Sequence, residues 1–359
     1  MGDFHGETTI SGTIRANSEQ VAIEYSDSGN SEEGASGRQS AIGISRGNRV
    51  NKGSDITSSE SGVVGVRNQG ERRRALNSRA AGTSGIHSKA MGGKICGQDG
   101  RKEMKTLVTA NQKGGVGKTS TLVHLAFDFF ERGLKVVVID LDTQANASYT
   151  LQSFLSGMSA SELFAGGVPN YAQISTDSEG MTLIESDAGL ANMEKMTLPE
   201  AGRNFREAIQ ALDEQGYDVC LIDTAPSLGI TMSAALLAAD YVISPMELEA
   251  YSIQGIKKMV TTIINIRKAN PKLKFLGMVP SKVDSRNPRH GRHLEELNQA
   301  YPQLMVPAGI GLRSSIADAL ASCVPVWKIK KTAARKAAQE VRALAAHVYE
   351  KMEINNDNR

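Results

Sequence analysis

From residue 105 onward, short apolar runs alternate with longer segments in which apolar residues recur at helical spacing. The apolar runs predict strands over residues 106–110, 135–141, 217–222, 241–244 and 274–279. The helical spacing predicts helices over residues 120–132, 199–215, 251–269 and 332–352. The run KVVVIDL at 135–141 is rich in β-branched residues, which is typical of a strand covered on both faces. This alternation predicts an α/β fold, a doubly wound and mostly parallel sheet with helices on both faces.

The last predicted helix, 332–352, carries its apolar residues on one side. They are Val341, Leu344, Ala345, Val348 and Met352, and a polar segment, INNDNR, follows them. Because this stripe has the ordinary width of a helix that covers a core, we expect it to pack inward. The alternative is an amphipathic helix that lies on a membrane.

Residues 1–103 differ in composition from the rest of the chain. They hold 18 of the 35 Gly and 15 Ser, but only two aromatic residues, Phe4 and Tyr25. Such a segment buries too little apolar surface to offset the entropy of ordering, so we expect a mostly disordered Gly/Ser-rich extension before a single domain at 104–359. A small helical module around 71–90, whose Arg72, Arg73 and Arg74 contact DNA or a partner, is the alternative. Met104 is a candidate internal translation start.

Charge and cysteine content exclude several classes of protein. The formal net charge is +2, and residues 104–359 carry 27 basic and 27 acidic residues, so they can bind nucleic acid only through a local basic patch. The three cysteines are far apart, which argues against a disulfide framework, a zinc site and a cysteine-ligated cluster. We find neither a signal segment nor an apolar run near the ~20 residues of a membrane helix, and therefore expect a cytoplasmic protein.

The strongest chemical signal is the segment NQKGGVGKT at 111–119. It follows a predicted buried strand and opens a predicted helix, which is the setting of a phosphate-binding loop. Its glycines let backbone N–H groups approach phosphate oxygens without a Cβ in the way. Lys118 would supply charge to the β- and γ-phosphates and Thr119 a hydroxyl to Mg²⁺. The loop is a variant, because Gln112 replaces the usual first Gly and Lys113 adds a second lysine.

Two predicted strands end in carboxylates. Asp140 and Asp142 end VVVIDLD, and Asp223 ends VCLID ahead of TAPSLG. In doubly wound sheets, ligands bind beyond the carboxyl ends of the strands. Carboxylates there can hold Mg²⁺ or orient water near a γ-phosphate, although an aspartate in this position also serves as a helix cap. Beside a phosphate-binding loop, the pattern favours a metal and nucleotide site.

Together these segments resemble the ParA family of plasmid and chromosome partition ATPases, within the MinD/ParA group that has a deviant Walker A loop. The resemblance covers about residues 104–352. It rests on KGGVGKT at 113–119, VVVIDLDTQAN at 136–146, DVCLIDTAPSLG at 218–229, SPMELEAYSIQG at 244–255 and SKVD at 281–284.

The resemblance implies ATP and Mg²⁺ as cofactors, and an ATP-dependent homodimer that encloses two nucleotides. Lys113 would reach the phosphates bound by the partner subunit, Lys118 would act in its own subunit, and Asp142 would position the attacking water. Mg²⁺ would be supported by Thr119, Asp140 and Asp223. The nucleotide would contact Lys113, Gly114, Gly115, Val116, Gly117, Lys118, Thr119, Ser120 and Asp284. Since SKVD also resembles the guanine-reading element of GTPases, GTP is the alternative nucleotide.

The family's dimer binds DNA without sequence specificity, and this chain offers basic residues for that. Ten Lys or Arg lie between Lys257 and Arg292, with only Asp284 as an acidic residue among them. The DNA-binding candidates are Arg286, Arg289, Arg292, Arg313, Lys328, Lys330, Lys331 and Arg335. Arg313 lies in GLRSSIADA, where spacing from Pro325 leaves open whether Ser315 takes the family arginine's place.

The implied function is a weak Mg²⁺-dependent ATPase that partitions plasmid DNA. The dimer would bind non-specific double-stranded DNA, be associated with the nucleoid, and be released when a ParB-type centromere-binding protein stimulates hydrolysis; we expect no membrane partner. Two alternatives are a MinD-like positioning ATPase on a membrane and an ATP-switched transcriptional co-regulator. A reductase of the nitrogenase iron-protein type would need cluster cysteines, and Cys220 lies in a predicted buried strand.

Overall fold

The computed structural model describes residues 14–17, 20–23, 102–167, 180–249 and 252–354. The chain divides into two compact units, Met1–Gly97 and Gln98–Arg359. In the first unit, β1 (Ile14–Asn17) and β2 (Gln20–Ile23) form an antiparallel pair that the sequence pattern did not predict. The alternative helical module at 71–90 lies outside the described residues, and the disorder expected for 1–103 stays a prediction.

The second unit is built on an eight-stranded sheet in the order β10-β9-β8-β3-β7-β4-β6-β5, in which every pair of neighbours is parallel. The predicted fold class is therefore confirmed. The strands are β3 (Lys105–Thr109), β4 (Val136–Leu141), β5 (Leu155–Ser159), β6 (Met181–Glu185), β7 (Val219–Thr224), β8 (Tyr241–Glu247), β9 (Lys274–Val283) and β10 (Ile310–Gly311).

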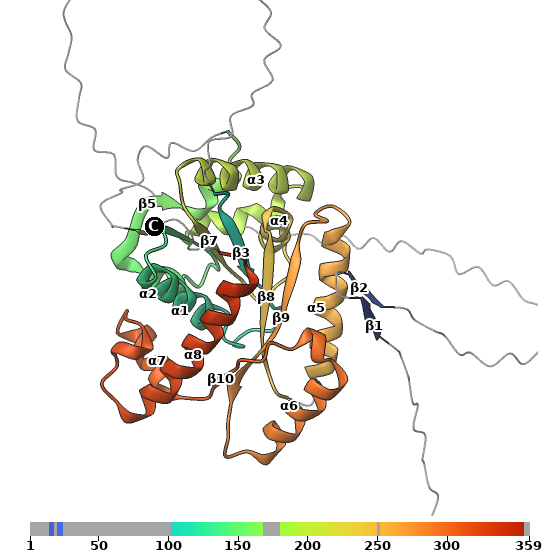
Figure 1. The fold of residues 1–359 in the computed structure, drawn as a ribbon. Helices are drawn as coiled ribbons and strands as arrows, with labels where there is room; N and C mark the ends of the chain where they lie inside the picture. Colours follow the sequence, from blue (N-terminus) through green and yellow to red (C-terminus); the bar gives the residue numbers. More distant parts are fainter. Residues whose placement is uncertain (1–13, 18–19, 24–101, 168–179, 250–251, 355–359) are drawn as a thin grey trace, which may run out of the picture. The chain divides into compact units, whose positions relative to one another are not determined.

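Helices cover both faces of this sheet, with α1 and α8 together on one face and α3, α4 and α5 on the other (Figure 1). The α-helices are α1 (Lys118–Glu131), α2 (Asn146–Thr150), α3 (Leu198–Glu214), α4 (Ile230–Ala238), α5 (Ser252–Arg267), α6 (Pro288–Ala300), α7 (Ser314–Ala321) and α8 (Thr332–Lys351). Described 3-10 turns are η1 (Gln152–Phe154), η2 (Ala160–Phe164), η4 (Ala188–Lys195), η5 (Pro302–Leu304) and η6 (Val326–Lys328).

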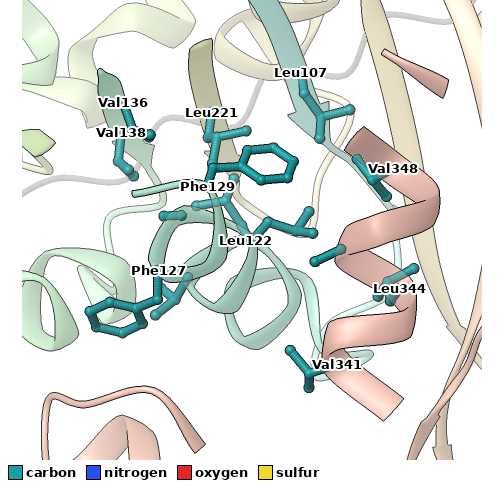
Figure 2. Packing of buried hydrophobic residues seen from close by; sticks show 14 of the residues in the cluster. Leu107, Leu122, Phe127, Phe129, Val136, Val138, Leu221, Val341, Leu344 and Val348 are labelled. Atoms are coloured by element: carbon teal, nitrogen blue, oxygen red, sulfur yellow. The ribbon is translucent and has the colours of Figure 1, made fainter. Parts of the chain in front are cut away.

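The main hydrophobic core lies between α1, α8 and the sheet. Figure 2 shows Leu122 and Phe129 of α1 between Leu221 of β7 and the apolar side of α8. Burial of these side chains drives α1 onto the sheet and fixes its N-terminus at the carboxyl ends of the strands. The predicted apolar side of α8 is buried in full: Val341, Leu344, Ala345, Val348 and Met352. The expectation that this helix packs inward is thus confirmed, and in the described part of the chain no helix is long and apolar enough to span a membrane.

A tryptophan fixes the segment that joins α7 to α8. Trp327, in η6, donates its indole N–H to Glu131 Oε1 of α1 at 2.8 Å. The guanidinium of Arg342 from α8 lies 3.6 Å from the centroid of the indole ring, a cation–π contact. The edge of His124 from α1 completes the packing. η6 is therefore attached to both helices on this face of the sheet.

Candidate functional site

The segment between β3 and α1 forms the loop that the sequence predicted. Asn111 anchors it, because its side-chain amide donates to the carbonyl oxygen of Pro245 at 2.8 Å and its Oδ1 accepts the Lys113 N–H at 2.9 Å. Gly117 has a φ of 94°, and a Cβ there would lie 2.7 Å from Ser281 Oγ. The glycine therefore allows the loop to turn beside Ser281, the first residue of the SKVD segment.

A cleft of about 360 Å³ opens beside the loop at the carboxyl edge of the sheet. The loop and the start of α1 form one wall, and the segments after β4 and β7, the end of β9 and the end of α7 supply the rest. The lining residues are Gly115, Gly117, Lys118, Thr119, Ser120, Asp142, Asn146, Tyr149, Thr150, Pro226, Lys282, Leu320 and Ala321. The structure thus brings together six of the predicted nucleotide, metal and catalytic residues in one cleft.

Lys118 is buried, with 6% of its surface exposed, and its Nζ donates to the carbonyl oxygen of Lys113 at 3.3 Å. Burial lowers the pKa of its ammonium, while the charges of Asp223 and Asp142 act in the opposite direction. A buried cation that faces a cleft gains most from an anionic ligand, because little water competes for it.

Thr119 lines the cleft and pairs with Asp223, which is fully buried and is not among the lining residues. Thr119 Oγ1 donates to Asp223 Oδ2 at 2.6 Å, and Thr109 Oγ1 donates to Oδ1 at 3.2 Å. Complete burial, together with the nearby Asp140 carboxylate, raises the pKa of Asp223 to about 7. A carboxylate and a hydroxyl in contact are oxygen donors of the kind that Mg²⁺ prefers, and a cation there would stabilise the charged form of Asp223. These two residues fit the predicted metal role.

The two carboxylates after β4 have different surroundings. Asp142 lines the cleft, and its carbonyl oxygen accepts the Ser186 hydroxyl at 2.7 Å. Asp140 is fully buried; its Oδ1 accepts the Asp142 N–H at 3.0 Å, and its Oδ2 accepts the Ser148 N–H and hydroxyl at 2.8 and 2.7 Å. Asp140 therefore fixes the turn that presents Asp142, and its metal role stays a prediction.

Four predicted nucleotide contacts lie outside the cleft lining. Gly114 contacts Pro226, and Val116 is buried beside a second, smaller hollow. Lys113 points away from the cleft, with its Nζ 2.5 Å from Glu249 Oε2 and 3.2 Å from Glu247 Oε2. Asp284 accepts two hydrogen bonds from the Arg286 guanidinium, each 3.0 Å long. A nucleotide contact at these four positions stays a prediction.

Seven of the eight predicted DNA-binding residues fall into two groups, on and before α6 and around η6 and the start of α8 (Figure 1), while Arg313 directly precedes α7. Three of them form ion pairs: Arg286 with Asp284, Arg313 with Glu340, and Lys331 with Asp318. Arg313 is held by two hydrogen bonds of 3.0 and 2.6 Å, and so joins the loop before α7 to α8. The other five predicted DNA-binding residues, Arg289, Arg292, Lys328, Lys330 and Arg335, are exposed, and none of them forms an ion pair with another described residue.

The sequence analysis missed the residues that reach the cleft from α2 and α7, and the two carboxylates beside Lys113. Asn146, Tyr149 and Thr150 follow Asp142 within eight positions, so their proximity in sequence was the available signal. Leu320 and Ala321 come from α7, about 180 positions further along the chain, and only the tertiary fold brings them to the cleft.

Comparisons with known proteins agree with this geometry. A family model described as an AAA domain matches residues 104–275. Two curated proteins from Escherichia coli, both called Protein IncC, are similar over most of the chain. One is 62% identical and covers 85% of this chain and 86% of its own length; the other is 50% identical and covers 99% of each. The chain belongs to the IncC family.

The IncC family lies within the plasmid and chromosome partition ATPases. The chromosome partitioning protein ParA of Caulobacter vibrioides is 34% identical to this chain, covering 51% of it and 72% of its own length. The resemblance to the ParA family that the motifs indicated is therefore confirmed.

Solved structures support the same fold. Cobyrinic acid a,c-diamide synthase from Mycobacterium smegmatis, with bound ATP analogue and magnesium, is 28% identical and covers 71% of this chain and 100% of its own, with a TM-score of 0.54. A plasmid partition protein from Borrelia burgdorferi B31 bound to AMPPNP is 22% identical and covers 69% of this chain and 100% of its own, with a TM-score of 0.53. This second likeness concerns the fold alone.

Proposed function

We propose that the protein is an ATP-dependent switch for plasmid partition, in which Mg²⁺-ATP closes a homodimer that binds non-specific DNA. One observation carries the proposal: the buried Lys118 ammonium, the Thr119 hydroxyl and the Asp142 carboxylate line one cleft beneath a glycine turn. This set matches the needs of a triphosphate, which are a charge partner, an oxygen donor for its cation and a group that can orient water.

ATP is the nucleotide that we propose, and its magnesium would neutralise charge on the phosphates. Support comes from the M. smegmatis relative, which binds an ATP analogue and magnesium. Lys118 would hold the phosphates, Thr119 and Asp223 would hold the cation, and Asp142 would accept a hydrogen bond from the attacking water. The low exposure of Lys118 and Asp142, 6% and 8%, supports strong electrostatic contacts because few water molecules screen them.

The dimer depends in this proposal on Lys113. Its side chain leaves its own cleft and is about half exposed, which supports a contact with the nucleotide of a second subunit. DNA would then bind to cations on two subunits at once, and association with the nucleoid follows from that affinity. A ParB-type partner would stimulate hydrolysis and release the dimer.

The test measures binding of the full chain to a DNA duplex of arbitrary sequence. Fluorescence anisotropy reports the binding in the presence of ATP, in the presence of ADP and without nucleotide. We expect tight binding in ATP alone, and a steep loss of affinity with salt, because phosphate contacts release counterions. Lys113→Ala should retain ATP but lose ATP-dependent DNA binding, and Asp142→Ala should retain DNA binding but lose hydrolysis stimulated by a ParB-type partner. DNA affinity that responds to neither ATP nor salt would contradict the proposal.

A further inference from the structure

Lys113 belongs to a row of four charged groups along the outer side of the phosphate-binding loop. Its Nζ lies 2.5 Å from Glu249 Oε2 and 3.2 Å from Glu247 Oε2. The other oxygen of Glu247, Oε1, lies 2.9 Å from the Nζ of Lys282. Lys282 in turn lines the nucleotide cleft. Two carboxylates therefore alternate with two ammonium groups, and the row joins the loop to the cleft.

The backbone fixes both carboxylates in place. Glu247 is the last residue of β8, and Ser252 begins α5. Ser252 Oγ accepts the Glu249 N–H at 2.8 Å and lies 2.8 Å from the carbonyl oxygen of Glu247. On the other side, the bond from the Lys113 N–H to Asn111 fixes the start of the lysine. Both partners of the Lys113 contact are thus held close before any ligand arrives.

Glu249 and Glu247 differ in the water and the ion partner that each carboxylate would have after Lys113 moves away. Glu249 is the more exposed, with 55% of its side chain accessible, so water can solvate it when the lysine departs. Glu247 has 20% of its side chain accessible and keeps Lys282 as a partner. Release of Lys113 leaves no buried carboxylate unpaired, and the cost of release is that of exposed ion pairs, which is small.

We propose that Glu249 and Glu247 are positioning residues that hold Lys113 against its own subunit until a triphosphate bound by a second subunit competes for it. The inference rests on the proposed function of Lys113 in the dimer. Glu249 is the residue that sets how much triphosphate is needed to release Lys113, because it makes the shorter contact and pairs with no other cation among the described residues. Lys113 donates its hydrogen bond to Glu249, and this bond raises the pKa of Lys113.

The experiment measures dimer formation by analytical ultracentrifugation of the full chain against the concentration of a non-hydrolysable ATP analogue. Glu249→Gln should lower the concentration at half dimerisation by about two- to fivefold, the range expected when an exposed ion pair is removed. Glu249→Asp, which keeps the charge, should stay close to wild type. The matched control is Glu353→Gln, since Glu353 pairs with Lys274 at the opposite edge of the sheet.

Two further measurements separate positioning from general effects. Affinity of the isolated subunit for the analogue should be equal in wild type and Glu249→Gln. Because the dimer depends on Lys113, Lys113→Gln and the double variant Lys113→Gln/Glu249→Gln should both stay monomeric with the analogue. Without nucleotide, an amine-acylating reagent should modify Lys113 faster in Glu249→Gln than in wild type, as mapped by mass spectrometry.

The outcomes distinguish the two proposals. If wild type dimerises with the analogue and Glu249→Gln does so at the same or a higher concentration, the positioning role is wrong while the proposed function stands. If Glu249→Gln promotes dimer formation in the Lys113→Gln background, the positioning role is also wrong, because Glu249 would then act without Lys113. If wild type binds the analogue but stays monomeric, the proposed function fails and the inference fails with it.

Discussion

The two halves of the phosphate-binding loop contrast in what they touch. The inner half, residues 115–120, lines the cleft with every residue except the buried Val116, while the outer half, residues 111–114, contacts β8 and α5. Lys118 of the inner half is buried, and burial lowers its pKa. Lys113 of the outer half is about half exposed, and the hydrogen bond that it donates to Glu249 raises its pKa. Two lysines five positions apart thus have opposite surroundings, and the proposed function gives them different tasks: Lys118 would hold a ligand inside its own subunit, and Lys113 would make a contact outside it.

Among these predictions, the largest effect should come from a substitution in the inner half of the loop, and it concerns the affinity for ATP. Lys118→Ala should weaken ATP binding by at least about a hundredfold, because it removes the buried charge partner of the phosphates. Isothermal titration calorimetry with ATP and Mg²⁺ gives the affinity, and Lys113→Ala is the matched control from the outer half, with affinity close to wild type. Equal losses of ATP affinity in the two variants would contradict a difference in role between the two halves of the loop.

The helix behind the inner half should make stability depend on pH through His124. His124 Nδ1 bonds the carbonyl oxygen of Ser120 at 2.7 Å, Nε2 faces the Val326 N–H, and burial lowers the pKa to about 4. Unfolded, the residue takes up a proton near pH 6.5. Between these values the unfolded state binds more protons, so the contribution of His124 is complete above pH 6.5 and is lost as pH falls toward 4.

Protonation of His124 in the unfolded state should lower the free energy of unfolding by about 2 kcal/mol between pH 6.5 and 5, since each pH unit in that window contributes about 1.4 kcal/mol. Urea unfolding of wild type and His124→Gln at both pH values isolates the contribution as the difference between their pH slopes. His347→Gln, at a partly exposed position on α8, should change the slope far less. Identical slopes in wild type and His124→Gln would show that His124 is not the titrating group.

The two glycines of the inner half with positive φ should differ in how much stability their replacement by alanine costs. Gly115 and Gly117 both have positive φ, but a Cβ on Gly115 would meet no atom within 4 Å, whereas one on Gly117 would approach Ser281 Oγ. Gly115→Ala should cost about 1 kcal/mol of backbone strain, and Gly117→Ala about 1 kcal/mol more. Urea unfolding measures both free energies. Adding Ser281→Ala should recover part of the loss for Gly117→Ala and nothing for Gly115→Ala; equal recovery would contradict the contact.

The smallest effect should come from a substitution in the outer half of the loop, at Gln112. Gln112 Nε2 donates to Thr262 Oγ1 of α5 at 3.0 Å, and Thr262 also donates to the Lys258 carbonyl oxygen. Gln112→Ala should cost about 0.5–1 kcal/mol in the free energy of unfolding, because Thr262 keeps a partner. ATP affinity should stay unchanged. A loss of ATP affinity would mean that the two halves act as one unit.

Local patterns predicted the central strands and the loop, because burial on both faces leaves a continuous apolar run. The predicted ends of two strands were wrong for a physical reason. The strands predicted at 241–244 and 274–279 stop directly before Pro245 and Pro280, yet β8 and β9 continue through these prolines. β8 pairs with β3 only as far as Ile243, so at Pro245 β3 offers no strand partner that would need its N–H, and the Asn111 side chain bonds the Pro245 carbonyl oxygen instead. The sequence also gave no signal for α4, which is apolar all round and buried.

In the site, the sequence predicted what the motif itself carries and missed what only the fold brings together. Lys113 meets Glu249 across 136 positions, and Arg313 meets Glu340 across 27. No local pattern encodes either contact. For Arg313 this matters, because a surface cation expected to face DNA is engaged with a carboxylate of its own chain. Asp140 was equally ambiguous, since an aspartate at a strand end can face a metal or, as here, bind the backbone of the next turn.

Trp327 is the only tryptophan in the sequence, and its indole packs against α1, the helix that starts in the nucleotide cleft. The protein therefore contains its own spectroscopic reporter. Emission of this single fluorophore, recorded while nucleotide is titrated, reads the packing between α1, η6 and α8 in real time and without an attached dye.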